Sequence, residues 1–231
     1  MLSTRPVGTA LVEAAAACGI VLDERAFIET KPIISDDVVR AVAELLQQQA
    51  TVAFTSMNAV EAVAALKKDM QPNWTIYSVG SNTSRLAATF FGEEQMAGTA
   101  SSAAALAEKI IRSGNTASFV FFCGNQRLDE LPDLLRSQGI RVDEIVVYET
   151  LQRQHRLTAE YDGILFFSPS AVHSYFSSNH PQERTVFFAI GSTTATAISK
   201  YTTRKVVVSP EPGKENLVKE AIAYFAKNEN R

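Results

Sequence analysis

The sequence predicts an α/β fold in which parallel sheets are covered by helices, arranged as two similar lobes with a cleft between them. Two observations carry this prediction. Short apolar runs alternate with amphipathic stretches along almost the whole chain, and a set of short strings recurs roughly half a chain later. Alternating strands and helices are typical of α/β proteins, and a long-period repeat indicates a duplicated structural unit.

Short apolar runs bounded by turn residues predict the strands, because a strand covered on both faces needs apolar residues at nearly every position. In chain order, the expected strands are Met1–Thr4, Val52–Thr55, Thr75–Val79, Phe119–Phe122, Gly163–Phe167, Val186–Ile190 and Val206–Val208. Amphipathic stretches between them predict helices. The clearest of these helices are Asp37–Gln49, Ala59–Lys68, Ala103–Arg112 and Asn216–Lys227.

The internal repeat consists of matching residues whose separation changes little along the chain. Gly19-Ile20, for example, recurs 120 residues later as Gly139-Ile140. Further matches pair Asp23-Glu24 with Asp143-Glu144, Glu29-Thr30 with Glu149-Thr150, Phe54 and Ser56 with Phe166 and Ser168, and Gly80-Ser81 and Thr83 with Gly191-Ser192 and Thr194. Because the matches occur in chain order, we interpret them as a duplication of about half the chain.

Two matching segments of the repeat, Val21–Thr30 and Arg141–Thr150, are long and extended in character. We expect them to pair as a two-stranded connector between the lobes. Pro32 and the polar stretch Gln152–Arg156 would then mark the places where the chain crosses from one lobe to the other.

Composition excludes several classes of function. The 231 residues include 46% hydrophobic and 20% charged residues, which is typical of a globular protein. No apolar run approaches the roughly 18 residues of a membrane span, and the polar start does not resemble a signal peptide, so we expect a cytoplasmic protein. The net charge of −3 argues against nucleic acid as the main partner. The two cysteines and the three histidines show no metal-ligand spacing, so we expect no metal site.

Small polar residues or glycine follow several expected strands, immediately before the next helix. Ser and Thr cap helices, and a helix N-terminus with free N–H groups binds anions. Several such turns around one cleft would suit a ligand with many carboxylates, whereas plain helix capping is the alternative. The residues concerned are Ser56, Ser81, Thr83, Gly124, Asn125, Ser168, Ser192 and Thr194.

Common catalytic motifs are missing from the sequence. It contains no G-x-G-x-x-G dinucleotide fingerprint, no P-loop and no G-x-S-x-G elbow. The functions that remain are a reaction without a cofactor and simple binding of a ligand. The alternatives are a two-lobed protein that binds a sugar or an anion, a nucleotide-linked transferase, and a flavin protein.

Tyr148 differs from its counterpart in the repeat. The first unit has Ile28 at this position, although Glu-Thr follows in both units. A tyrosine can donate a proton in general acid catalysis. The alternative is a half-buried tyrosine whose hydroxyl is solvated.

Six strings together resemble those of the uroporphyrinogen-III synthase family: FTSMNAV, VGSNTSRLA, CGNQRLDELPDLLRSQGI, VVYET, FFSPSAV and AIGSTTATAI. They occur in the family's order and at its spacing, between an initial STRP and a terminal SPEPGKENLVKEAI. The resemblance covers essentially the whole chain, and the combination of strings is specific.

This resemblance implies two flavodoxin-like lobes with parallel sheets, joined by a two-stranded β-ladder. One lobe would comprise residues 1–30 with residues 151–231, and the other residues 31–150. The implied reaction is the closure of hydroxymethylbilane, which carries eight carboxylates, to uroporphyrinogen III in haem biosynthesis. It would proceed through loss of water, an azafulvene and a spiro intermediate that inverts ring D, without a cofactor.

The resemblance also implies roles for individual residues. Tyr148 would be the general acid. Ser56, Thr83, Ser168 and Thr194 would bind substrate, together with the adjacent Ser81, Ser192, Gly124 and Asn125. We expect a monomer, and hydroxymethylbilane synthase is a candidate partner because it supplies the substrate.

Overall fold

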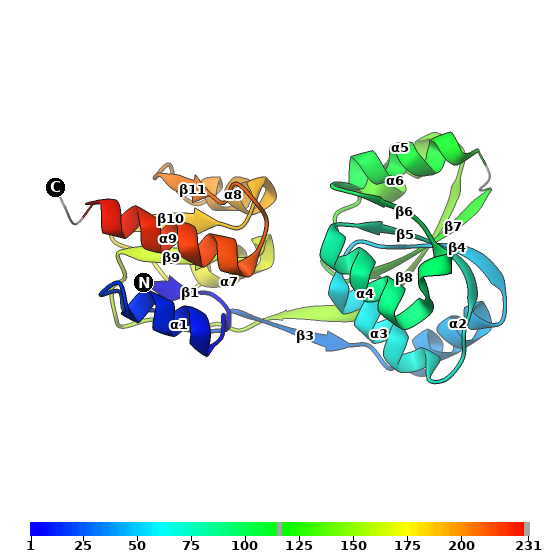
Figure 1. The fold of residues 1–231 in the computed structure, drawn as a ribbon, viewed down its shortest axis with the longest axis horizontal. Coiled ribbons are helices and arrows are strands. Elements are labelled where there is room, and N and C mark those ends of the chain that lie inside the picture. Colours follow the sequence, from blue (N-terminus) through cyan, green and yellow to red (C-terminus); the bar gives the residue numbers. More distant parts are fainter. Residues whose placement is uncertain (115–116, 229–231) are drawn as a thin grey trace. The chain divides into compact units, whose positions relative to one another are not determined.

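The structure is a computed structural model that describes residues 1–114 and 117–228. Contacts divide the chain into two compact units. Unit 1 consists of Met1–Glu29 and Leu151–Arg231, and unit 2 of Thr30–Thr150. The chain therefore passes from unit 1 into unit 2 and returns (Figure 1).

Unit 2 is built around a six-stranded sheet with the order β3-β8-β7-β4-β5-β6. Its strands are β3 (Ile28–Pro32), β4 (Gln49–Phe54), β5 (Asn73–Val79), β6 (Met96–Ala100), β7 (Ser118–Gly124) and β8 (Arg141–Gln152). Pairing from β8 across to β6 is parallel throughout. The helices are α2 (Asp36–Leu46), α3 (Met57–Lys67), α4 (Ser81–Phe91), α5 (Ala103–Ser113) and α6 (Glu130–Ser137), with a short 3-10 turn at Glu93–Gln95.

Helices cover both faces of the unit 2 sheet, because its central strands are apolar on both sides. On one face, α2, α3 and α4 pack over Phe54, Ile76 and Phe122, whereas α5 and α6 pack over Phe119 and Phe121 on the other. Figure 1 shows α3 and α4 on the opposite face from α5 and α6. Burial of such rings is the main stabilising contribution of a core.

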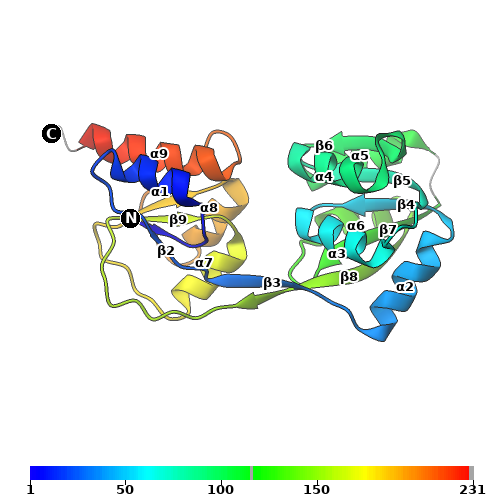
Figure 2. The ribbon, with the colours of Figure 1, turned by 60° about the horizontal axis from the view of Figure 1, so that its bottom comes forward.

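Unit 1 contains a five-stranded parallel sheet with the order β11-β10-β9-β1-β2. Its strands are β1 (Leu2–Ser3), β2 (Asp23–Glu24), β9 (Gly163–Phe166), β10 (Val186–Ala189) and β11 (Val206–Val208). The helices are α1 (Thr9–Ala16), α7 (Pro169–Phe176), α8 (Ser192–Ser199) and α9 (Lys214–Asn228). Helices α1 and α9 pack on one face of the sheet and α7 and α8 on the other (Figure 2).

The two units have the same strand order, which confirms the α/β fold with parallel sheets. The order β2-β1-β9-β10-β11 in unit 1 corresponds to β8-β7-β4-β5-β6 in unit 2, where β3 is an additional strand beside β8. The segments that the repeat matches occupy equivalent places in these orders. Phe27 of unit 1 and Val147 of unit 2, for example, are both fully buried next to the paired residues Ile28 and Tyr148.

Several expected elements have different bounds in the structure; β4, for example, begins at Gln49 rather than at Val52. The extended segment Val21–Thr30 is broken into β2 and the start of β3, because Phe27 turns inward and packs against Tyr175 and His155. The helix expected over Asp37–Gln49 ends at Leu46, and Gln49 begins β4. Gln47 is the C-cap of this helix, and the three glutamines at positions 47–49 include no residue that marks where a helix stops.

Strand β3 lies beside β8 at the edge of the unit 2 sheet. The N–H of Ile33 donates to the carbonyl of Val147 at 2.8 Å, and the N–H of Arg153 donates to the carbonyl of Phe27 at 2.8 Å. From Phe27 to Ile33 the residue numbers rise along one segment, while those of their partners fall from Arg153 to Val147. This pairing is therefore antiparallel, unlike the rest of the sheet.

Candidate active site

Ser56 and Ser168 have the same local geometry in their two units. Each is the N-cap of a helix that follows a central strand, α3 in unit 2 and α7 in unit 1. The Ser56 Oγ accepts a hydrogen bond from the N–H of Ala59 at 3.2 Å, and the Ser168 Oγ accepts one from Ala171 at 3.2 Å. Both serines therefore have a structural role as caps.

Thr83 and Thr194 also form an equivalent pair, and they have no such capping role. Each is the third residue of a helix whose N-cap is a glycine, Gly80 or Gly191. Only 6% of Thr83 and 3% of Thr194 is exposed. Among the described residues, neither side chain has a hydrogen-bond partner. No buried side-chain oxygen or nitrogen among the described residues lacks a partner, so these two hydroxyls are the accessible part of otherwise buried side chains. An accessible hydroxyl without a protein partner is free to bind a ligand.

Ser81 and Ser192 are the first residues of the same two helices, and neither is buried. The glycine before each of them provides no side-chain cap. The first N–H groups of α4 and α8 have no partner within their own helix, and together with the positive end of the helix dipole they can bind an anion.

Tyr148 lies next to Ser56 in unit 2. It extends from β8 and packs against the cluster formed by α2, α3 and α4. The Ser56 hydroxyl donates to the phenol oxygen of Tyr148 at 3.1 Å. Because Ser56 Oγ already accepts from Ala59, its own proton is directed at Tyr148, which leaves the phenol proton for another acceptor.

A cavity of about 190 Å³ adjoins the Tyr148 ring. Its walls come from β3, from one face of α3 and from Tyr148 itself. Lining residues are Thr30, Lys31, Pro32, Asn58, Glu61, Ala62, Ala65 and Tyr148. The volume is below the ~300 Å³ of typical ligand pockets, so it suits one ring or one side chain of a larger molecule.

Asn58 and Glu61 were not predicted as site residues from the sequence. Their spacing with Ala62 and Ala65 places all four on one face of α3, the helix that Ser56 caps. This spacing groups the four residues on one face, but nothing in the sequence shows that this face borders Tyr148.

Gly124 and Asn125 lie at the end of β7, against Tyr148. A Cβ built on Gly124 would lie 2.6 Å from Cε2 and 2.8 Å from the hydroxyl of Tyr148, so a larger residue would collide with the ring. The Asn125 side chain accepts a hydrogen bond from the N–H of Thr150 at 2.8 Å. Tyr148, Ser56 and Gly124 are thus brought together in unit 2, whereas Ser168, Ser192 and Thr194 belong to unit 1.

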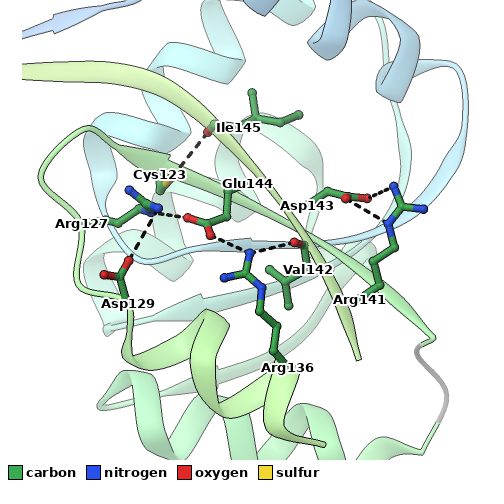
Figure 3. A network of polar contacts seen from close by, with 9 residues as sticks. All are labelled: Cys123, Arg127, Asp129, Arg136, Arg141, Val142, Asp143, Glu144 and Ile145. Atoms are coloured by element: carbon green, nitrogen blue, oxygen red, sulfur yellow. Dashed lines mark hydrogen bonds and ion pairs between the residues drawn. The ribbon is translucent and has the colours of Figure 1, made fainter. Parts of the chain in front are cut away.

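An ion-pair network joins β8 to α6 and to the segment that follows β7 (Figure 3). The Glu144 carboxylate binds the guanidinium groups of Arg127 and Arg136, the latter at 2.8 Å. Burial opposes ionisation of Glu144, but the hydrogen bonds from the two arginines outweigh it and lower the pKa of this carboxyl. Burial also raises the pKa of the nearby Cys123 thiol to about 11, so this cysteine is a neutral thiol at physiological pH.

Residues 1–114 and 117–228 contain no group of three or more His, Cys, Asp or Glu side chains that could hold a metal ion. In the same part of the chain, no helix combines the length and the apolar character that crossing a membrane requires.

The family model of uroporphyrinogen-III synthase HemD matches residues 9–219, well over half of the 231 residues. The chain belongs to the uroporphyrinogen-III synthase family. It therefore has the family's cyclising lyase activity, which converts hydroxymethylbilane to uroporphyrinogen III in haem biosynthesis. The family that the sequence strings indicated is confirmed.

Solved structures of uroporphyrinogen-III synthases share the fold. The enzyme from Helicobacter pylori matches with a TM-score of 0.69 at 16% identity, over 96% of this chain and 98% of that one. A mutant enzyme from the extremely thermophilic bacterium Thermus thermophilus matches with a TM-score of 0.65 at 17% identity, over 99% of this chain and 98% of that one. These likenesses support the fold with two parallel-rich sheets.

Proposed function

We propose that Tyr148 is the general acid of the cyclisation, assisted by Ser56. The single observation that carries this proposal is the hydrogen bond from the Ser56 hydroxyl to the Tyr148 phenol oxygen. This bond leaves the phenol proton available for the substrate. The same bond keeps a hydrogen-bond donor on the phenol oxygen once its proton has been transferred.

In the proposed mechanism, the Tyr148 phenol transfers its proton to the terminal hydroxyl of hydroxymethylbilane. The carbon–oxygen bond breaks, water leaves, and the pyrrole nitrogen supplies the electron pair that forms the azafulvene. Ring closure and inversion of ring D then release one proton, which restores the phenol. Holding the flexible substrate in a reactive conformation supplies the remaining rate enhancement.

We further propose that Thr83 and Thr194 bind carboxylates of the substrate, with Ser81 and Ser192 beside them. Nearly complete burial of both threonines, without a hydrogen-bond partner in the part of the chain that the structure describes, supports this role. The helix N-termini of α4 and α8 add unpaired N–H groups and a favourable dipole. The substrate carries eight carboxylates, so several such sites would be used together.

Replacing Thr83 by valine keeps the side-chain shape and removes the hydroxyl. We expect KM to rise roughly ten- to a hundredfold, because a hydrogen bond to a charged group contributes about 1.5–3 kcal/mol. Thr194→Val should behave in the same way. The matched control is Thr89→Val on the exposed face of α4, whose hydroxyl bonds the carbonyl of Arg85 in its own helix. An unchanged KM in the Thr83 and Thr194 variants would contradict this role.

The isomer distribution of the product tests the function directly. Hydroxymethylbilane is generated in place from porphobilinogen and its deaminase, with and without the protein, and the oxidised products are separated by chromatography. Uncatalysed closure gives the type I isomer. Diversion to type III is the expected result, whereas type I alone in the presence of folded protein would favour a two-lobed binding protein.

We expect the protein to act in the cytoplasm as a monomer, with hydroxymethylbilane synthase as a candidate partner. Direct transfer between the two enzymes would protect the substrate from uncatalysed closure. Sedimentation of the protein alone and mixed with that synthase tests both the oligomeric state and the partnership.

A further inference from the structure

Strand β8 contains a bulge just before Tyr148. Cys123 of β7 pairs with Val146, but the next residue, Gly124, pairs with Tyr148 rather than with Val147. Two residues of β8 therefore lie opposite one step of β7, as in a β-bulge. Such bulges commonly redirect a side chain and occur next to active sites.

The bulge determines which face of the sheet Tyr148 occupies. Val142 and Val146 pack on the side of α5 and α6, and Ile145 and Val147 pack on the side of α3. Strict alternation would place Tyr148 with Val146. Instead it packs on the α3 side, where Ser56 lies. Without the bulge, the phenol would be on the wrong face to meet Ser56.

Asn125 binds β8 at the place where the β7 ladder ends. Its N–H donates to the carbonyl of Tyr148 at 3.1 Å, and its side-chain oxygen accepts from the N–H of Thr150 at 2.8 Å. Gln126 adds a bond from its side-chain amide to the carbonyl of Thr150 at 3.0 Å. The Asn125 side chain thus continues the pairing of β8 after the backbone of β7 has ended.

Two further features of the same region bear on the position of Tyr148. The absence of a side chain on Gly124 gives the Tyr148 ring its space. Farther along the segment, Arg127 binds Glu144 on β8, so the segment is fixed to the strand at both ends (Figure 3). A segment held by several contacts is suited to holding a reactive group within the small tolerance that catalysis requires.

We propose that Asn125 is a positioning residue that acts through Tyr148 and does not bind the substrate. By accepting from Thr150 it holds the bulged end of β8, and so keeps the phenol beside Ser56. This inference rests on the proposed catalytic role of Tyr148. It differs from the role in substrate binding that the family resemblance implies for Asn125.

Replacement of Asn125 by alanine and by aspartate separates the two roles. A positioning residue needs only an acceptor for the Thr150 N–H, which aspartate provides. We expect Asn125→Ala to lower kcat about tenfold or more with little change in KM, and Asn125→Asp to stay within about threefold of the wild type. If Asn125 donated to substrate carboxylates, aspartate would repel them, and Asn125→Asp would have a higher KM than Asn125→Ala.

A double variant tests whether Asn125 acts through the phenol. Adding Asn125→Ala to Tyr148→Phe should lower kcat much less than it does in the wild type, because the group that it positions is already missing. An equal loss in both backgrounds would overturn the proposal. The control is Asn73→Ala at the exposed start of β5, and thermal unfolding followed by Trp74 fluorescence verifies that each variant is folded.

The outcomes separate failure of this inference from failure of the proposed function. If Tyr148→Phe is impaired but the Asn125 variants change KM alone, only the positioning role is wrong. If Tyr148→Phe keeps wild-type turnover, the catalytic role of Tyr148 is wrong, and the positioning role fails with it.

Discussion

Tyr148→Phe is expected to lower turnover by roughly ten- to a thousandfold, within or below the usual effect of losing a proton donor. The change removes one oxygen and leaves the ring, which packs against the α2–α3–α4 cluster, in place. KM should change little, because the phenol would act in the transition state and contribute little to ground-state binding. Initial rates of type III formation measure the effect.

The matched control for this variant is Tyr77→Phe. Tyr77 lies on β5 of the same unit, but it packs with the α5–α6 cluster on the other face of the sheet. Its hydroxyl is therefore absent from the candidate active site, and its loss should leave turnover near the wild-type value. Wild-type turnover in Tyr148→Phe would end the proposed role of the phenol as general acid.

Phe91→Ala should lower the free energy of unfolding of unit 2 by about 3–5 kcal/mol, the usual cost of removing a buried phenylalanine ring. Phe91 is 0% exposed at the end of α4. Its ring centroid lies 5.6 Å from that of Phe54 and 5.5 Å from that of Trp74. The alanine would leave a cavity at the centre of the cluster.

The neighbouring residue provides the control. Phe90 is 37% exposed on the same helix, so Phe90→Ala should cost less than about 1 kcal/mol. Trp74 is the single tryptophan of the chain and lies in unit 2, so its fluorescence in urea follows that unit. Equal destabilisation by the two variants would contradict the assignment of Phe91 to the core.

The sequence by itself determined the fold class and the duplication of the structural unit. Apolar runs identify doubly covered strands because burial on both faces leaves no polar position in the pattern. The repeat paired Ser56 with Ser168 and Thr83 with Thr194, and in the structure each pair has equivalent helix positions. These are local features, so short strings of residues are sufficient to identify them.

The strand breaks and the added site residues could not be predicted in the same way. The turn that splits Val21–Thr30 depends on Phe27 reaching rings far along the chain, at His155 and Tyr175. Asn58 and Glu61 have no unusual sequence context, and they line the cavity only because α3 packs beside β3 and Tyr148. Contacts between distant segments leave no periodic signal in the sequence.

The sequence thus identified Tyr148 and the strand that carries it, whereas the tertiary structure decided which way the phenol points. Alternation along β8 predicts the opposite face, and one extra residue in the pairing with β7 reverses it. Beside this bulge, a glycine leaves room for the ring and Asn125 accepts a hydrogen bond from Thr150, and both contacts join segments that are distant in the sequence. A one-residue change of register moves a side chain to the other face of the sheet. Such a change is visible in the pairing of the strands and not in the sequence of either strand.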